Sequence, residues 1–270
     1  MTVIAMTREM GSLGKEIARD LADHFESRLV YHELIGDPPE PSHLDEPSEV
    51  KRHLGNGSDT NGASHRNGRM TPVELLELAS RGNVIIRGWG AVRLLHQIPH
   101  IFCVRVCAPM QDRVDEIVRR LGVSERNARR EIHRSDDLHS NVFERLSGGD
   151  WRDALNYDMV VNTARVRPED AADLIVEAVS RPTFQETDES RQILADRLSE
   201  ARIASFLAND PDLAGACRNV YVSVSGSAVT LYGAVRGWGL AREIGAAVQA
   251  HADVAEVRNS IQTIGDYISA

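Results

Sequence analysis

A glycine-rich loop between a short apolar run and a helical pattern constrains this chain more than any other feature. Residues 2–6 are apolar without alternation, as in a buried parallel strand. Gly11 and Gly14 end this run, and beyond them apolar side chains recur at helical spacing, at Ile17, Ala18, Leu21, Ala22 and Phe25. Glycines let backbone N–H groups turn toward an anion, and a helix N-terminus adds partial positive charge. The pattern predicts a phosphate-binding loop in which Lys15 reaches the outer phosphates.

The loop matches only part of the standard phosphate-loop pattern, G-x-x-x-x-G-K-S/T. Gly14 and Lys15 fit, but Glu9 stands at the first glycine position and Glu16 at the hydroxyl position. That hydroxyl normally holds a magnesium ion. The residues by themselves therefore leave two interpretations equally open, a phosphate loop or a glycine-rich turn with an exposed lysine.

Strands and helices alternate along the first two thirds of the chain. After residues 2–6, the expected strands are 29–31, 83–87, 101–107 and 158–162, and the expected helices are 71–80, 91–96, 109–121, 124–132 and 168–179. Thr71 and Glu74 fit a capping box, with Pro72 at the first helical position. The alternation predicts an α/β domain, in which helices cover both faces of a parallel sheet.

Two segments interrupt this alternation. Residues 36–70 are rich in proline, glycine and polar side chains, which predicts a flexible insert. Residues 181–189 form a polar linker. Beyond it, a helix at 189–208, strands at 220–224 and 229–232, a helix at 240–250 and a strand at 256–264 predict a small α+β domain over residues 190–268.

Composition argues against several classes of function. The net charge of −9 argues against a nucleic-acid groove, and no apolar run approaches the roughly 20 residues that span a bilayer. The N-terminus lacks the features of a signal peptide, so we expect a cytoplasmic protein. Cys103, Cys107 and Cys217 lack a matching cluster of ligands, so we predict buried thiols and no protein metal site.

Four motifs resemble the cytidylate kinase-like family, relatives of the bacterial CMP kinases, over roughly residues 1–180. The first is T-R-E-M-G-S-L-G-K-E-I-A at residues 7–18, followed by Y-H-E-L-I at 31–35. The second is V-I-I-R-G-W-G-A at 84–91. The third is V-R-V-C-A-P at 104–109, followed by an arginine-rich stretch and I-H-R-S-D at 132–136. The fourth is N-Y-D-M-V-V-N-T at 156–163.

The resemblance implies a phosphate-loop nucleoside monophosphate kinase fold and a set of site residues. It implies that Arg87 holds the acceptor nucleotide and that the other residues which bind nucleotide phosphates are Arg8, Gly11, Ser12, Leu13, Gly14, Lys15, Glu16 and Arg113. Arg113, Arg119, Arg120 and Arg134 would form a lid ordered by Asp136, with Lys15, Arg119, Arg120, Arg134 and Asp136 in catalytic roles. Mg²⁺ would be held mainly by phosphate oxygens and water.

Two departures from the family pattern bear on catalysis. His139 and Asn141 occupy places where the family carries an arginine and an aromatic residue, and the insert 36–70 replaces the region that covers the monophosphate. Without the resemblance, the arginine-rich stretch also fits a solvated helix face balanced by Glu116, Glu125 and Glu131.

The last 80 residues resemble a BON domain. The resemblance rests on N-V-Y-V-S-V at 219–224, Gly226, V-T-L-Y-G-A-V at 229–235, and V-A-E-V-R-N-S-I at 254–261. It implies an interaction or sensing module for a protein or phospholipid partner. Arg236, Trp238 and Arg242 could touch an anionic ligand.

Three hypotheses follow from the sequence. The first is a nucleotide-dependent phosphotransferase most like an ATP-dependent CMP or dCMP kinase. The second is a catalytically weakened protein that senses a nucleotide or another phosphate ligand. The third is an adaptor that works through residues 189–268. Nucleotides are the expected partners, nucleic acid is not, and the oligomeric state is open, a homo-oligomer included.

Overall fold

The computed structural model describes residues 1–31, 33–34, 69–147, 149–237, 239–251 and 255–264. It divides into two compact units, Met1–Glu186 and Thr187–Ala270, and the boundary falls inside the segment predicted as a linker. Most of the predicted insert 36–70 lies outside the described residues, as does Trp238. The last two residues of that segment are an exception, because Arg69–Met70 form a strand, β4, parallel to β3 (Glu33–Leu34). Met70 is buried, which ties this end of the segment to the folded unit.

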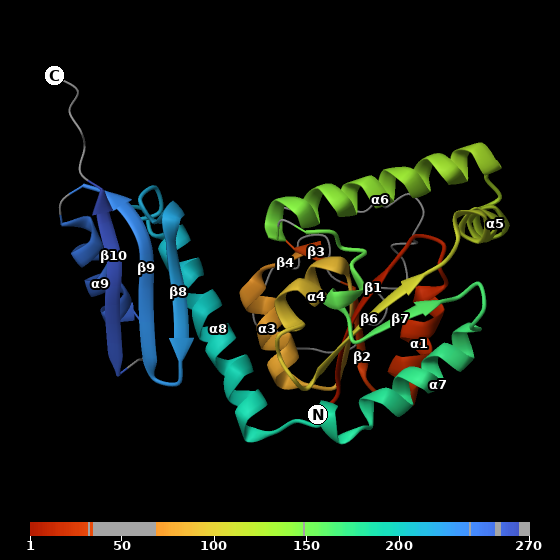
Figure 1. Ribbon diagram of the computed structural model, residues 1–270, viewed down its shortest axis with the longest axis horizontal. Coiled ribbons are helices and arrows are strands. Elements are labelled where there is room, and N and C mark those ends of the chain that lie inside the picture. The colour runs from red at the N-terminus through yellow and green to blue at the C-terminus, as the bar shows by residue number, and fades with distance from the viewer. Residues whose placement is uncertain (32, 35–68, 148, 238, 252–254, 265–270) are drawn as a thin grey trace, which may run out of the picture. The chain divides into compact units, whose positions relative to one another are not determined.

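The first unit is built on a five-stranded, fully parallel sheet, shown in Figure 1. Its strands are β1 (Val3–Arg8), β2 (Arg28–Tyr31), β5 (Val84–Arg87), β6 (Ile101–Cys107) and β7 (Met159–Asn162), in the order β2-β5-β1-β6-β7. The central strand β1 is buried along its whole length, which explains its unbroken apolar pattern. The strand order reverses beside β1, and open α/β sheets bind ligands at such a point, beyond the carboxyl ends of the strands.

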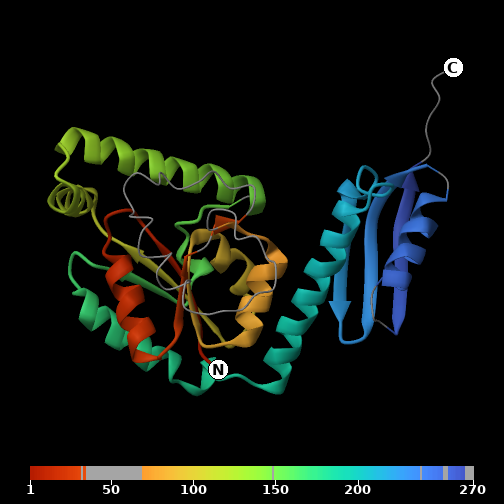
Figure 2. The same ribbon diagram turned by 180° about the vertical axis from the view of Figure 1, so that it is seen from behind.

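Helices cover both faces of this sheet, as predicted. In Figures 1 and 2, α1 (Gly14–His24) and α7 (Pro168–Val179) lie on one face, and α3 (Pro72–Arg81) and α4 (Trp89–Leu95) lie on the other. The core of the first face joins Ile17, Leu21 and Ile175 of the helices to Ile4 and Val104 of the strands. The α/β fold with a helix-covered parallel sheet is confirmed.

Helices α5 (Met110–Leu121) and α6 (Glu125–Ser147) form a separate pair after β6. Their shared apolar cluster contains Val114, Ile117, Ala128 and Ile132, and it includes Met10 of the glycine-rich loop. The pair is therefore anchored to the loop by hydrophobic contacts.

The second unit contains two helices and a three-stranded sheet. The elements are α8 (Asp188–Asn209), β8 (Val220–Ser225), β9 (Ala228–Arg236), α9 (Leu240–His251) and β10 (Glu256–Ile264). In the order β10-β9-β8, β9 pairs antiparallel with β8 and parallel with β10. β9 extends four residues beyond the predicted strand, because Val235 reaches the core formed by Leu231, Ile244 and Val248.

The segment predicted as a linker carries local structure. A short 3-10 turn, η2 (Pro182–Phe184), begins it, and the Phe184 ring packs edge-on against Phe102 of β6 at 4.8 Å. Thr187 then caps α8 by accepting the Ser190 N–H at 3.1 Å. Among the described residues, no helix is long and apolar enough to cross a membrane.

The cap of α3 offers a test of local stability. The Thr71 hydroxyl accepts the Glu74 N–H at 3.2 Å, and the Glu74 carboxylate accepts the Thr71 N–H at 2.7 Å. We expect Thr71→Ala to lower the free energy of unfolding by about 1 kcal/mol, because the Glu74 N–H then loses the hydroxyl that accepts its hydrogen bond. Urea titration of the full chain measures the loss. Thr71→Ser keeps the hydroxyl as a control, and equal stability of the two variants would contradict the prediction.

Candidate functional site

The glycine-rich loop joins the carboxyl end of β1 to the first turn of α1. Its turn is closed by Ser12, whose N–H and hydroxyl both donate to the Glu9 carbonyl, at 3.1 and 2.8 Å. The hydroxyl also lies 3.2 Å from the Val106 carbonyl of β6. Leu13 then takes a left-handed conformation at φ 60°. The Ile17 N–H donates to the Leu13 carbonyl, so the N–H groups of residues 14–16 precede the ladder of hydrogen bonds inside the helix.

Gly11 is required where the loop crosses α5. It has φ 81°, and a Cβ atom there would lie 2.5 Å from the Arg113 carbonyl oxygen. Gly14 faces a similar limit, because its Cβ would lie 2.8 Å from the Arg8 Cβ. Both glycines are therefore explained by close packing of the loop against its supports.

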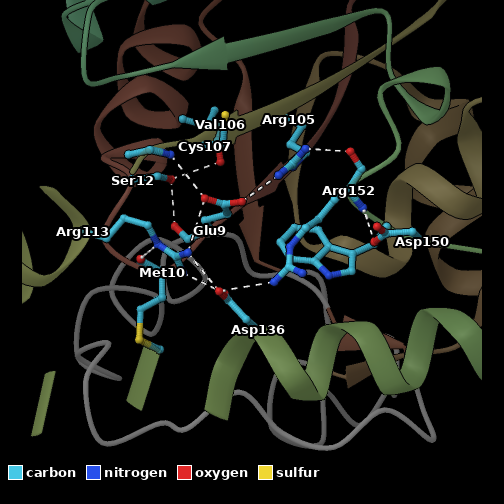
Figure 3. A network of polar contacts seen from close by, with 12 residues as sticks. Glu9, Met10, Ser12, Arg105, Val106, Cys107, Arg113, Asp136, Asp150 and Arg152 are labelled. Atoms are coloured by element: carbon cyan, nitrogen blue, oxygen red, sulfur yellow. Dashed lines mark hydrogen bonds and ion pairs between the residues drawn. The ribbon is translucent and has the colours of Figure 1, made fainter. Parts of the chain in front are cut away.

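Glu9 lies in a buried network of charged side chains, shown in Figure 3. Its carboxylate accepts a hydrogen bond from Arg105 at 2.6 Å and lies 3.4 Å from Arg113. The Ala108 N–H donates to the same carboxylate at 3.3 Å. Glu9 is 6% exposed, so this carboxylate bonds to protein groups instead of lining an open phosphate cradle.

Arg113 connects Glu9 to the helix pair. Its Nε donates to the Met10 carbonyl of the loop at 2.8 Å, and its two terminal nitrogens donate to the Asp136 carboxylate of α6 at 2.9 and 2.7 Å. Arg113 is 3% exposed and Asp136 is 5% exposed. This bidentate pair, of the strong charge-assisted kind, ties the loop, α5 and α6 together.

Arg105, Trp151 and Arg152 complete the network, and none of the three was predicted from the sequence as a site residue. Arg105 and Arg152 each lie over the buried Trp151 ring at 5.2 Å, and Arg152 lies 3.4 Å from Asp136. Arg105 donates to the Arg152 carbonyl at 2.8 Å. The available sequence signal was Arg105 itself, a charge within the apolar run 101–107.

The sequence-predicted residues occupy three different environments. Arg8 and Arg87 are both 8% exposed at the carboxyl ends of β1 and β5, and Arg87 lies over the Tyr31 ring at 4.8 Å. Lys15 is partly buried in the first turn of α1, beside Glu16. The loop residues Gly11, Ser12 and Leu13 and the pair Arg113 and Asp136 come together around the network.

The predicted lid arginines lie mainly on the surface of the helix pair. Arg119 is exposed and forms a two-point pair with Glu116 at 2.7 Å, and Arg134 lies 3.9 Å from Glu131. Arg120 is partly buried. The ion pairs expected for a solvated helix face are therefore present at Arg119 and Arg134.

An open pocket of about 330 Å³ lies beside the loop. Gly11, Leu13, Ala108 and Thr163 line one part, and the α5 side chains line the rest, namely Asp112, Asp115, Glu116 and Arg119. Thr163 also donates to the Ser12 carbonyl at 2.9 Å, which holds the loop to the end of β7. The pocket thus places a space of ligand size against the loop and the predicted lid.

Burial shifts the pKa of two groups near the loop. Burial, together with the Glu9 charge, raises the pKa of the Cys107 thiol above its usual range, so this thiol stays protonated. Burial also raises the pKa of the Tyr157 phenol to about 12. That phenol donates to the Trp151 carbonyl at 2.6 Å.

Comparison with known proteins agrees with this geometry. The model of the cytidylate kinase-like family matches residues 3–165. The chain belongs to the cytidylate kinase-like family. The match covers the parallel sheet, the glycine-rich loop and the helix pair, so membership in this family concerns the first unit.

Individual relatives match only part of this chain. A cytidylate kinase from Sulfolobus acidocaldarius is 33% identical over 110 residues, which cover 40% of this chain and 60% of the relative. A cytidylate kinase from Ignicoccus hospitalis is 35% identical over 112 residues, which cover 40% of this chain and 59% of the relative. The chain thus spans about 60% of the length of these curated relatives. An uncharacterized protein from Eubacterium ventriosum, known from its crystal structure, shares 19% identity over 67% of this chain and all of that chain, with a TM-score of 0.49.

Two glycines allow the packing of the loop to be tested. We expect Gly11→Ala to destabilise the chain more than Gly122→Ala, because only Gly11 has a neighbouring main chain in the way. Gly122 also has positive φ, 66°, but no atom lies within 4 Å of the place that its Cβ would take, so its cost is only the left-handed strain of about 1–2 kcal/mol. Urea unfolding of both variants measures the difference. Equal losses would show that the Arg113 carbonyl does not restrict the loop.

Tyr157 gives a test in alkaline solution. The unfolded phenol loses its proton near its ordinary pKa of 10, whereas the folded phenol keeps it up to about 12. Stability from this group is therefore present below pH 10 and is lost as the pH rises toward 12, by about 1 kcal/mol between pH 10 and 11. The gap in unfolding free energy between wild type and Tyr157→Phe should narrow by that amount. A gap that is independent of pH would contradict the prediction.

Proposed function

We propose that the first unit is a nucleoside monophosphate kinase that transfers the γ-phosphoryl group of ATP to CMP or dCMP. One observation carries this proposal. The glycine-rich loop with Lys15 and the buried Arg87 stand at the carboxyl ends of the neighbouring strands β1 and β5. A donor phosphate chain and an acceptor phosphate bound by these groups would meet at the same edge of the sheet. Family membership and the two cytidylate kinase relatives support this choice of reaction.

The N–H groups at the start of α1 and the Lys15 ammonium are the proposed holders of the donor phosphates. These groups suit a phosphate anion because the helix N-terminus and the lysine both contribute positive charge. Arg8 and Arg87 are the proposed ligands of the acceptor side, since a planar guanidinium binds phosphate oxygens in two-point contacts. The pocket beside Thr163 and Arg119 is the proposed place of the donor nucleoside.

The helix pair α5 and α6 is the proposed lid. Arg119, Arg120 and Arg134 would neutralise the negative charge that spreads over the transferring group, after Arg119 and Arg134 leave their partly buried partners Glu116 and Glu131. Because both arginines are exposed to solvent, screening weakens these two ion pairs, so closure is not prevented. Arg113 and Asp136 are proposed as positioning residues, because their hydrogen-bonding atoms face each other and the loop.

The proposed cofactors are ATP and Mg²⁺. The residues present fit both, because the helix start provides N–H donors and Glu16 provides a carboxylate oxygen where the standard pattern has a hydroxyl. Magnesium prefers oxygen ligands and keeps several waters, so phosphate oxygens would supply most of its coordination. In the reaction, an oxygen of the acceptor phosphate bonds to the γ-phosphorus, the bond to the β-phosphate oxygen breaks, and ADP leaves.

A second candidate is a nucleotide sensor with little or no turnover. Two features of the loop favour it. The Glu9 carboxylate is paired with Arg105 and Arg113, and Glu16 stands where the standard pattern has the magnesium-binding hydroxyl. In a sensor of this kind, the loop would bind the phosphates of the nucleotide, but the lid arginines would not close over a γ-phosphoryl group.

For the second unit, we propose an interaction module of the BON type that serves a protein or phospholipid partner. Its support is the resemblance of residues 190–268, together with the α+β architecture in which two helices cover one face of a three-stranded sheet. The division into a kinase-like domain at 1–180, a linker at 181–189 and this module belongs to the same proposal.

A coupled assay that follows ADP formation tests the kinase proposal. The full chain is supplied with ATP, Mg²⁺ and, in turn, CMP, dCMP, UMP, AMP and GMP. We expect turnover with CMP or dCMP, and a loss of at least about 100-fold in Lys15→Ala, because the phosphate charge is then unmatched. Arg181→Ala, which removes an exposed arginine paired with Glu177, is the control and should leave the rate unchanged.

Lysine labelling separates the two candidate functions. The chain has only two lysines, Lys15 and Lys51, so acetylation at each can be read separately by mass spectrometry. ATP should protect Lys15 under either proposal. Protection without turnover for any monophosphate would reject the kinase and favour the sensor, and no protection at all would reject both.

A further inference from the structure

The second unit carries a groove that the proposed phosphoryl transfer does not use. It has a volume of about 420 Å³ and lies between α9 and β10. Small residues of the helix form one wall, and alternate residues of the strand form the other: Ala241, Gly245 and Ala246 on the helix, and Val257, Asn259 and Ile261 on the strand. The Asn259 amide donates to the Ala241 carbonyl at 2.5 Å, which holds the two walls together.

β10 stands at the edge of its sheet. Among the described residues it pairs with β9 and with no other strand. The Ile261 N–H donates to a nearby side chain of its own strand, Asn259 Oδ1, at 3.2 Å, so this N–H points away from β9. Because strand N–H groups alternate in direction, those of Val257, Asn259 and Thr263 point to the same outer edge. A nine-residue edge with outward donors is a template for another strand.

The two walls have matching lengths. On α9, residues 241 and 249 are separated by about 12 Å at 1.5 Å per residue. On β10, residues 257 and 261 are separated by about 13 Å at 3.3 Å per residue. The groove therefore follows the edge strand over about four residues of an extended chain. Side chains of an added strand alternate in direction, so every second one would enter the groove above the small helix residues.

The charge of Arg242 at the groove favours extended segments that carry an acidic side chain. Arg242 lies in the wall of the groove, is exposed, and forms no ion pair within the part of the chain that the structure describes. The neighbouring arginine of the strand, Arg258, differs because it is paired with Glu256 at 3.0 Å. An acidic side chain of the bound segment would therefore complement Arg242.

We propose that the α9–β10 groove binds an extended segment of a partner protein, which adds as a strand to the outer edge of β10. The segment places small or apolar side chains at alternate positions against Ala246 and Val257 and an acidic side chain against Arg242. Backbone N–H and carbonyl groups of β10 supply the pairing. This inference rests on the proposed role of the second unit as an interaction module and assigns that module its partner chemistry.

A library of random twelve-residue peptides displayed on phage tests the groove. The full chain and its Ala246→Trp variant are used as targets in parallel, because Ala246 is exposed and a large ring there fills the groove. Ala250→Trp, at an exposed position of α9 outside the groove, is the matched control. We expect the wild type and Ala250→Trp to enrich the same peptides, and Ala246→Trp to enrich none of them. The enriched peptides should carry an acidic residue flanked by apolar residues at alternate positions.

The strongest peptide is then measured by fluorescence anisotropy and hydrogen exchange. We expect Arg242→Glu to weaken binding of this peptide at least tenfold and to favour a version with lysine in place of the acidic residue. Arg218→Glu, at an exposed position of the second unit outside the groove, should leave the affinity unchanged. Slowed exchange at Val257, Asn259 and Thr263 would support strand addition. The proposal would be overturned if the wild type and Ala246→Trp enriched the same peptides equally. It would also be overturned if the peptide bound without slowing hydrogen exchange in β10.

Two other outcomes would replace the proposal with a different occupant. A concentration-dependent dimer that Ala246→Trp abolishes would assign the groove to a second copy of this chain. Sedimentation with phosphatidylglycerol vesicles that is lost in Arg242→Glu, in the absence of peptide enrichment, would assign Arg242 to lipid and keep the second unit as an interaction module.

Discussion

The buried contact between Arg113 and the two carboxylates of Glu9 and Asp136 supports the rest of the site. Two carboxylates removed from water would each cost several kcal/mol without a partner, and the surrounding arginines supply these partners. Because Arg113 also donates to the Met10 carbonyl, the same side chain holds the glycine-rich loop against the helix pair. The conformation of the loop therefore depends on α5 and α6 as well as on its own glycines.

This arrangement accounts for the glutamate that this chain carries where the standard phosphate-loop pattern has its first glycine. A glycine in place of Glu9 would leave Arg105 and Arg113 with fewer partners in a buried space. Trp151 then covers the network, with two arginines over its ring. These charged groups hold the loop from the side of β6 and α5 through Glu9 and the Met10 carbonyl.

The two units present different kinds of binding surface. In the first, the candidate site lies beyond the carboxyl ends of parallel strands, where N–H groups, Lys15 and Arg87 suit a phosphate anion. In the second, the outer edge of β10 and the groove beside it suit an extended peptide, because strand edges offer backbone donors. A chain with these two surfaces would join nucleotide binding to partner recognition.

The sequence by itself determined the order of the main strands and helices, the cap at Thr71, the helix start at Pro168 and the loop with Lys15, because each of these depends on residues close together in the chain. It did not determine the partners of Glu9. Arg105 lies 96 residues further along the chain, and Arg113 and Asp136 become neighbours of the loop only when α5 and α6 pack on it. The sequence therefore predicted Arg113 as a phosphate ligand. Only the tertiary structure shows that this guanidinium supports the loop, because folding buries it between two carboxylates.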